Sequence, residues 1–158
     1  MNTSIMNKKR CGFSLIELVI VVVIIGIIGA IAIPRLSRGA EGASDSALAG
    51  DLAVLRNAID LYATEHGGTY PTVADFVAQL TTYTDVNGNP NATKTGDFIY
   101  GPYIRKIPAL KVGTEKGSTD VAAAAASTVG WVYDATAGTI LPNTGTLKDA
   151  SGKLYTDY

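Results

Sequence analysis

The sequence is poor in several residue types, and each shortage excludes a class of protein. Its single cysteine, Cys11, leaves neither an intramolecular disulfide framework nor a cysteine-rich zinc site. Thirteen basic side chains against fourteen acidic ones give a formal net charge of −1. Nucleic-acid-binding proteins are usually basic, so we predict no nucleic-acid partner. At 47% apolar residues, the 158-residue chain is also not a fully disordered protein.

The common catalytic motifs are missing too. The sequence has no H-E-x-x-H segment, no Walker loop and no G-x-G-x-x-G segment after an expected strand. The only histidine, His66, lies at an expected helix end without a nucleophile elbow or a nearby cysteine. We therefore predict that the protein is not an enzyme.

What the chain does have is one long apolar run, from Phe13 to Ile33, interrupted by the single charge of Glu17. At ~1.5 Å per residue a helix of this length spans roughly 31 Å, which is about one bilayer core. The end of the run lacks a clear small-x-small cleavage site. The run is therefore predicted to be a transmembrane helix rather than a secretory signal that is removed.

Basic residues on either side of the run bear on its orientation. Lys8, Lys9 and Arg10 are the only basic residues before it, and the positive-inside rule then places the N-terminus in the cytoplasm. Arg35 and Arg38 follow the run and weaken this bias. The C-terminal part is expected outside the cytoplasm, in the periplasm of a Gram-negative cell.

Glu17 is unusual because a carboxylate inside a lipid span costs roughly 2.5–3.5 kcal/mol on insertion scales. It lies only five residues into the run, near one membrane face. Two interpretations stay open at this point: the side chain reaches the headgroups, or it binds a positive partner in a protein assembly.

The segment around this carboxylate, KKRCGFSLIE at residues 8–17, resembles the class III signal of type IV pilins and type II secretion pseudopilins. That signal has a basic leader, glycine at the cleavage site, phenylalanine, a small polar residue, two aliphatic residues and glutamate before an apolar helix. Pro34 also falls where the family has a helix-kinking proline. The resemblance implies a long N-terminal helix packed on a small antiparallel β-sheet, an α+β fold.

The resemblance also implies how the chain is processed and assembled. Prepilin peptidase would cleave between Gly12 and Phe13, the new amine of Phe13 would be N-methylated, and Glu17 would pair with the Phe13 amine of a neighbouring subunit. Cleavage would remove three basic residues and Cys11, leaving ten basic and fourteen acidic side chains and no cysteine. The chain then divides into a leader (1–12), a transmembrane and filament-core helix (13–38) and a periplasmic head (39–158).

Within the head, apolar residues at helical spacing predict that the long helix continues to about residue 65. These residues are expected to form the head core: Leu48, Leu52, Leu55, Ile59 and Tyr62. Gly67 and Gly68 follow and favour an end near His66.

The rest of the head has weaker signals. Thr72 and Asp75 resemble a cap for a short helix through Leu80, and residues 84–97 form a polar, turn-rich loop. Residues 130–134 and 139–142 predict a β-hairpin, with Trp131 as a core residue. The alanine run at 122–126 is either a helical turn or a loop. The tail after Asn143 is expected to be irregular or a short edge strand.

Residues 68–72, GTYPT, resemble a turn of major pseudopilins. We therefore expect a structural subunit of a type II secretion pseudopilus, a single-pass protein of the bacterial inner membrane that polymerises into a periplasmic homo-oligomeric filament. The implied partners are prepilin peptidase, the inner-membrane assembly platform and minor pseudopilins. The alternatives are a major or minor type IV pilin for adhesion or motility, and a membrane-tethered periplasmic binding protein or enzyme.

No cofactor or metal ligand is assigned. Major pseudopilins often bind calcium through acidic side chains of a C-terminal loop, and calcium prefers such hard oxygen ligands. Here the tail offers Asp149, Ser151 and Asp157, with Lys148 and Lys153 between them. Because this departs from a dense acidic loop, calcium stays an open alternative.

Overall fold

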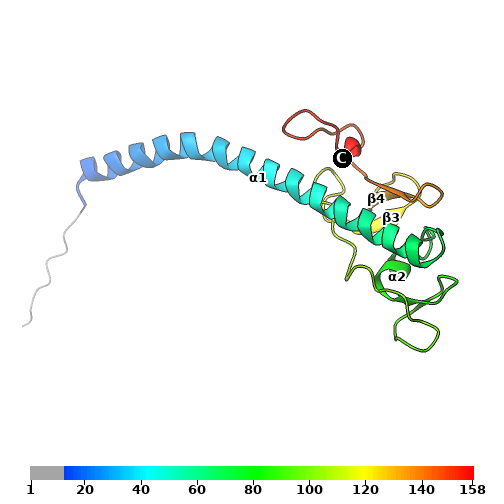
Figure 1. Cartoon of the computed structure of the whole chain (residues 1–158). Helices are drawn as coiled ribbons and strands as arrows, with labels where there is room; N and C mark the ends of the chain where they lie inside the picture. Colours follow the sequence, from blue (N-terminus) through cyan, green and yellow to red (C-terminus); the bar gives the residue numbers. More distant parts are fainter. Residues whose placement is uncertain (1–12) are drawn as a thin grey trace, which may run out of the picture. The chain divides into compact units, whose positions relative to one another are not determined.

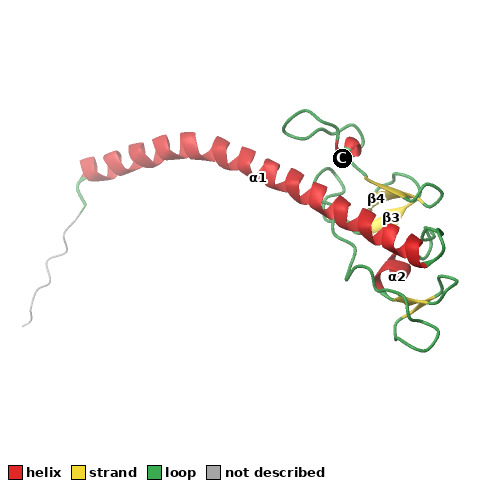
Figure 2. Ribbon diagram, in the orientation of Figure 1, coloured by secondary structure: helices red, strands yellow, loops and turns green. Residues whose placement is uncertain are grey.

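The structure, a computed structural model, describes residues 13–158, and these divide into two compact units at the junction of Gly39 and Ala40. Figure 2 shows that loops make up much of the second unit, which we call the head. The elements in chain order are α1 (Leu15–Glu65), α2 (Phe76–Thr81), β1 (Tyr83–Thr84), β2 (Pro90–Asn91), β3 (Asp120–Ala122), β4 (Val129–Asp134), β5 (Thr139–Pro142) and the 3-10 helix η1 (Tyr155–Asp157).

Helix α1 confirms the long helix expected from the sequence and contributes to both units. It ends at Glu65 in a Schellman motif, because Gly67 adopts a left-handed φ of 64° and the Gly68 N–H donates to the Ala63 carbonyl at 2.7 Å. Glycine adopts this conformation without the steric cost of a Cβ atom, which explains why the chain turns back here.

The head core lies between the second part of α1, the sheet β3-β4-β5 and α2 (Figure 1). The five α1 residues of the expected stripe are at most 2% exposed: Leu48, Leu52, Leu55, Ile59 and Tyr62. From the sheet, Trp131, Tyr133 and Ile140 are fully buried in the same cluster. The Trp131 indole N–H donates to the Pro108 carbonyl at 2.9 Å, so the polar atom of this core residue is satisfied.

The predicted β-hairpin is confirmed, since β4 and β5 pair antiparallel with Tyr133 opposite Ile140. The expected α+β fold is confirmed, with an antiparallel pair β1–β2 and a mixed three-stranded sheet in which β3 pairs with β4 in parallel. Parallel neighbours usually need a long crossover. Here β3 has three residues, roughly 10 Å of chain, so residues 123–128 suffice for the return. The alanine run therefore begins at the end of a strand and continues as a loop.

The short helix begins later than its sequence cap suggests. Thr72 Oγ1 accepts the Asp75 N–H at 3.2 Å and so closes a turn before the helix, while α2 itself begins at Phe76. Buried Gln79 holds this turn from inside the helix, with its Oε1 accepting the Thr72 N–H at 2.8 Å and its Nε2 donating to the Gly88 carbonyl at 2.9 Å.

Candidate functional site

The apolar segment is the first candidate functional element. Within α1, Leu15–Ile33 is long and apolar enough to cross a membrane, and none of it is buried. Its nineteen helical residues extend ~28 Å, close to the ~30 Å hydrocarbon core of a bilayer. The branched side chains all around the helix therefore have no partner among residues 13–158, and lipid or other helices must cover them.

Glu17 lies in the first turn of α1 and is exposed. No ion pair with Glu17 exists among residues 13–158. Phe13, which directly precedes the helix, is 79% exposed, whereas Gly12 and the rest of the leader lie outside the described residues. The structure thus presents an apolar helix whose one carboxylate has no partner within the described chain.

The expected boundary after residue 38 lies one residue before the division at Gly39. Helix α1 runs across position 34, and the kink expected at Pro34 stays a prediction.

Two glycines of the apolar segment, Gly26 and Gly29, are not required by any close contact within the described chain. Gly26 and Gly29 lie inside α1, and no heavy atom outside the local helix would lie within 4 Å of an added Cβ. Glycine inside a helix costs roughly 0.5–1 kcal/mol relative to alanine. In membranes, small residues let a second helix backbone approach closely.

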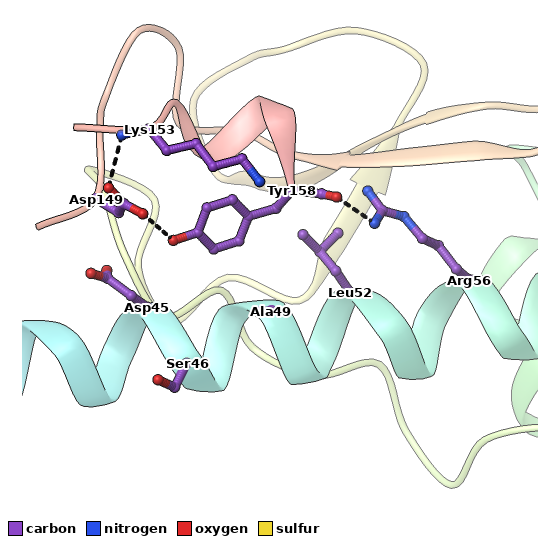
Figure 3. Close-up of a pocket in the computed structure, with 8 residues that line it drawn as sticks. All are labelled: Asp45, Ser46, Ala49, Leu52, Arg56, Asp149, Lys153 and Tyr158. Carbon is purple, nitrogen blue, oxygen red and sulfur yellow. Dashed lines mark hydrogen bonds between the residues drawn. The ribbon is translucent and has the colours of Figure 1, made fainter. Parts of the chain in front are cut away.

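The head contains a pocket of about 430 Å³ between α1 and the C-terminal tail (Figure 3). Its lining comes from α1 (Asp45, Ser46, Ala49, Leu52 and Arg56) and from the tail (Asp149, Lys153 and Tyr158). The Tyr158 hydroxyl donates to Asp149 Oδ2 at 2.6 Å, and Arg56 Nη1 donates to the Tyr158 carbonyl oxygen at 2.8 Å. The walls therefore carry both signs of charge, and their polar groups largely bind one another.

Beside the pocket, the Tyr155 hydroxyl donates to Asp45 Oδ1 at 2.6 Å in a buried contact. Desolvation, followed by this bond to a carboxylate, raises the pKa of Tyr155 above its usual range. The Asp149 bond, followed by desolvation, raises the pKa of Tyr158 to about 12. Conversely, hydrogen bonds from Tyr158 and then Ser151 hold the pKa of Asp149 well below its usual range.

Comparison with known proteins decides the nature of the first element. Residues 7–33 match the family described as the prokaryotic N-terminal methylation motif. The chain carries a type IV pilin-like class III signal. No match was found among curated proteins or among solved structures. The matched segment ends at Ile33, where the candidate membrane span also ends.

The signal indicates that this pilin-like protein is a structural subunit, and it implies processing by prepilin peptidase and assembly into a filament. One apolar N-terminal helix together with the motif fits a single-pass protein of the inner membrane.

The tail residues considered for calcium make other contacts in the head. Asp149 Oδ1 accepts the N–H groups of Ser151 and Lys153 at 2.8 and 2.9 Å, and the Ser151 hydroxyl at 2.7 Å. With Oδ2 bound to Tyr158, both carboxylate oxygens have protein donors. No group of three acidic or histidine side chains able to hold a metal occurs in the described part of the chain. In this conformation Asp149 is occupied by protein donors, and calcium binding by the tail stays a prediction.

His66 is held in a structural position. Its Nδ1 lies 2.8 Å from the Tyr62 carbonyl, its Nε2 lies 3.1 Å from Thr84 Oγ1, and its ring stacks on that of Tyr62 with centroids 3.9 Å apart. These contacts connect the end of α1 to β1.

Sequence reasoning missed Asp45, Arg56 and Tyr155. Asp45 precedes Tyr155 by 110 residues, and Arg56 precedes Tyr158 by 102. No local pattern marks contacts over such separations. The one available signal was a pair of tyrosines, Tyr155 and Tyr158, in a mostly polar tail.

Proposed function

We propose that the protein is the major pseudopilin of a type II secretion system. The single observation that carries the proposal is the carboxylate of Glu17, unpaired within the described chain, on an exposed apolar helix that begins at Leu15 inside the segment matched by the methylation-motif family. In this proposal the precursor has a cytoplasmic N-terminus and a periplasmic head. Prepilin peptidase cleaves it after Gly12, and Phe13 becomes the methylated N-terminal residue.

Glu17 then acts in assembly through its charge. An unmatched carboxylate in lipid is costly, and an ion pair with the free amine of Phe13 on a neighbouring copy removes that cost. A copy inserted out of register leaves both charges unpaired. The contact thereby selects the axial position of each new subunit and contributes more to register than to stability.

The apolar surface and its glycines support such assembly. Leu18, Ile25 and Ile31 are 50% or more exposed, so neighbouring helices have side chains to pack against. Gly26 and Gly29 would let one helix backbone approach the next closely. Polymerisation from the inner-membrane platform would extend a periplasmic filament, with minor pseudopilins as its other subunits, and so drive protein export.

Two features favour a pseudopilin over a surface pilin. The mature chain has no cysteine for the disulfide that closes the C-terminal loop of many adhesive pilins. The GTYPT turn is also built into the head, since the Tyr133 hydroxyl donates to the Pro71 carbonyl at 3.0 Å in a buried contact. The second candidate, a type IV pilin for adhesion or motility, shares the N-terminal signal.

The test replaces Glu17 by alanine in a strain whose own copy is deleted. Mass spectrometry is expected to find the mature N-terminus at Phe13 with its methyl group, while filament yield falls steeply. Asp60→Ala is the matched control, because it removes the same charge from an exposed position of the same helix outside the apolar segment. Normal filaments from Glu17→Ala would contradict the pairing.

Two further measurements address processing and the type of filament. Gly12→Leu is expected to block cleavage, because the peptidase needs little bulk beside the scissile bond, and wild-type protein beginning at Met1 in membranes would contradict processing. Deletion of the gene is expected to stop export of a secreted protein, and intact wild-type cells are expected to show no surface filaments. Surface filaments on wild-type cells, together with normal secretion in the deletion strain, would instead identify a pilin.

A further inference from the structure

The last twelve residues, 147–158, are attached to the head in an unusual way. In the described chain, the backbone-to-backbone hydrogen bonds of this segment stay within residues 144–158, including Asp149 N–H to the Lys153 carbonyl at 2.8 Å and Tyr155 N–H to the Leu147 carbonyl at 3.2 Å. The segment is therefore not a strand of the head sheet. Within the described chain, its hydrogen bonds to the rest of the head all involve side chains.

Two residues of α1 provide those side chains. Asp45 accepts the Tyr155 hydroxyl at 2.6 Å and the Ala150 N–H at 3.2 Å, and Arg56 donates to the Tyr158 carbonyl at 2.8 Å. Asp45 and Arg56 are eleven residues apart, which is about three helical turns, so they lie on the same face of α1 roughly 16 Å apart. Figure 3 shows Asp149, Lys153 and Tyr158 of the segment lying alongside this face of the helix.

The segment also has a firm internal structure. The Asp149 carboxylate collects donors from Ser151, Lys153 and Tyr158, and so holds the turn at 149–153 against the end of the chain described here. Tyr155 and Tyr158 pack edge to face with ring centroids 5.7 Å apart. These contacts lie inside the segment and would persist if it moved away from α1.

Just before the segment, a hydrogen-bonded residue, Asn143, is followed two positions later by an open glycine, Gly145. The Asn143 N–H donates to the Gly130 carbonyl at 2.9 Å, and its side chain donates to the Val129 carbonyl at 2.8 Å, which fixes it to β4. Gly145 follows with a φ of 58° and has nothing within 4 Å of an added Cβ. Buried Thr144 still belongs to the anchored strand, so a hinge at residues 145–146 separates that strand from the segment.

We propose that residues 147–158 form a strap that opens from α1 as one unit about this hinge, held closed by Asp45 at one end and Arg56 at the other. Opening removes the cover from the pocket face of α1 and leaves the β4–β5 hairpin in place. Such separable units open at a lower free energy than the whole fold. The inference concerns the head alone and holds for a pseudopilin and for a pilin.

In the closed state, polar contacts with Asp45 and Arg56 attach the strap to α1, as a covalent cross-link could. The mature chain expected from the signal contains no cysteine. Tyr155, only 8% exposed, adds burial against the core to its bond with Asp45, so the Asp45 end is the stronger attachment. The Arg56 end rests on one short bond to the strap. We therefore expect opening to begin at Tyr158.

The experiment is amide hydrogen exchange by mass spectrometry on the full chain in detergent. Tyr155→Phe removes one hydroxyl that donates to a buried carboxylate, and such bonds correspond to a change of roughly 10- to 100-fold in the opening equilibrium. Exchange of residues 147–158 is expected to accelerate by that factor, while exchange of β4 and β5 and the fluorescence of Trp131 stay unchanged.

Two further variants make the test specific. Tyr103→Phe is the matched control, because Tyr103 also donates to a carboxylate, Glu65 Oε2 at 2.7 Å, but away from the strap; strap exchange should not change. Arg56→Gln should accelerate exchange of the strap from the other end, and it serves as the decisive variant if Tyr155→Phe fails to fold. Equal acceleration of the strap and of β4, or no acceleration in either strap variant, would overturn the proposal.

Discussion

Two neighbouring residues of α1 offer a sharp test of which helix face stabilises the head. Leu55 is fully buried in the core, whereas Val54 is 50% exposed. They share the same helix and the same local backbone, so truncating each to alanine separates burial from helix propensity. Leu55→Ala should destabilise the head strongly, and Val54→Ala should leave its stability almost unchanged.

The expected magnitudes follow from burial. Removing a fully buried leucine side chain costs its transfer free energy plus a cavity term, together about 3 kcal/mol. A substitution at an exposed position usually changes the free energy of unfolding by less than about 0.5 kcal/mol. For a head of this size, the Leu55 variant should melt roughly 10 °C lower than the wild type.

Trp131 provides the assay, because it is the only tryptophan and is fully buried in the same core. Chemical unfolding of the full chain in detergent, followed by Trp131 fluorescence, gives the free energy of unfolding for each variant. Processing should stay normal in both variants, since the matched signal ends at residue 33. Equal destabilisation by the two substitutions, or none by Leu55→Ala, would refute the assigned core face.

Two other predictions concern the tail and the hairpin turn. The bond to Asp149 raises the pKa of Tyr158 from 10 to about 12. This contact is therefore fully stabilising below pH 10 and is lost as the pH rises through 12. Hydrogen exchange of the tail should increase over that window, in parallel with tyrosinate absorbance. Gly138→Ala should destabilise the head by at least about 1 kcal/mol more than Gly67→Ala. Both glycines have a φ near 65°, but only at position 138 would the new Cβ clash with the Tyr70 ring. Similar unfolding midpoints for the two glycine variants would show that Tyr70 moves away without cost.

Local patterns in the sequence determine the first half of the protein. A continuous apolar run can only satisfy its backbone as a helix in lipid, and the signal around Gly12 and Phe13 is contiguous in the chain. The amphipathic stripe from Leu48 to Tyr62 and the hairpin around Trp131 are likewise periodic over short distances. Each of these features depends on neighbours in sequence, so the sequence alone predicts them.

The tertiary structure alone decides which distant segments meet. The parallel pairing of β3 depends on a strand too short to show a pattern, and the start of α2 is set by contacts of Gln79 with two loops. The attachment of the tail through Asp45 and Arg56 joins residues more than a hundred positions apart. Such contacts require segments that the folded core holds side by side, and for that reason no local pattern encodes them.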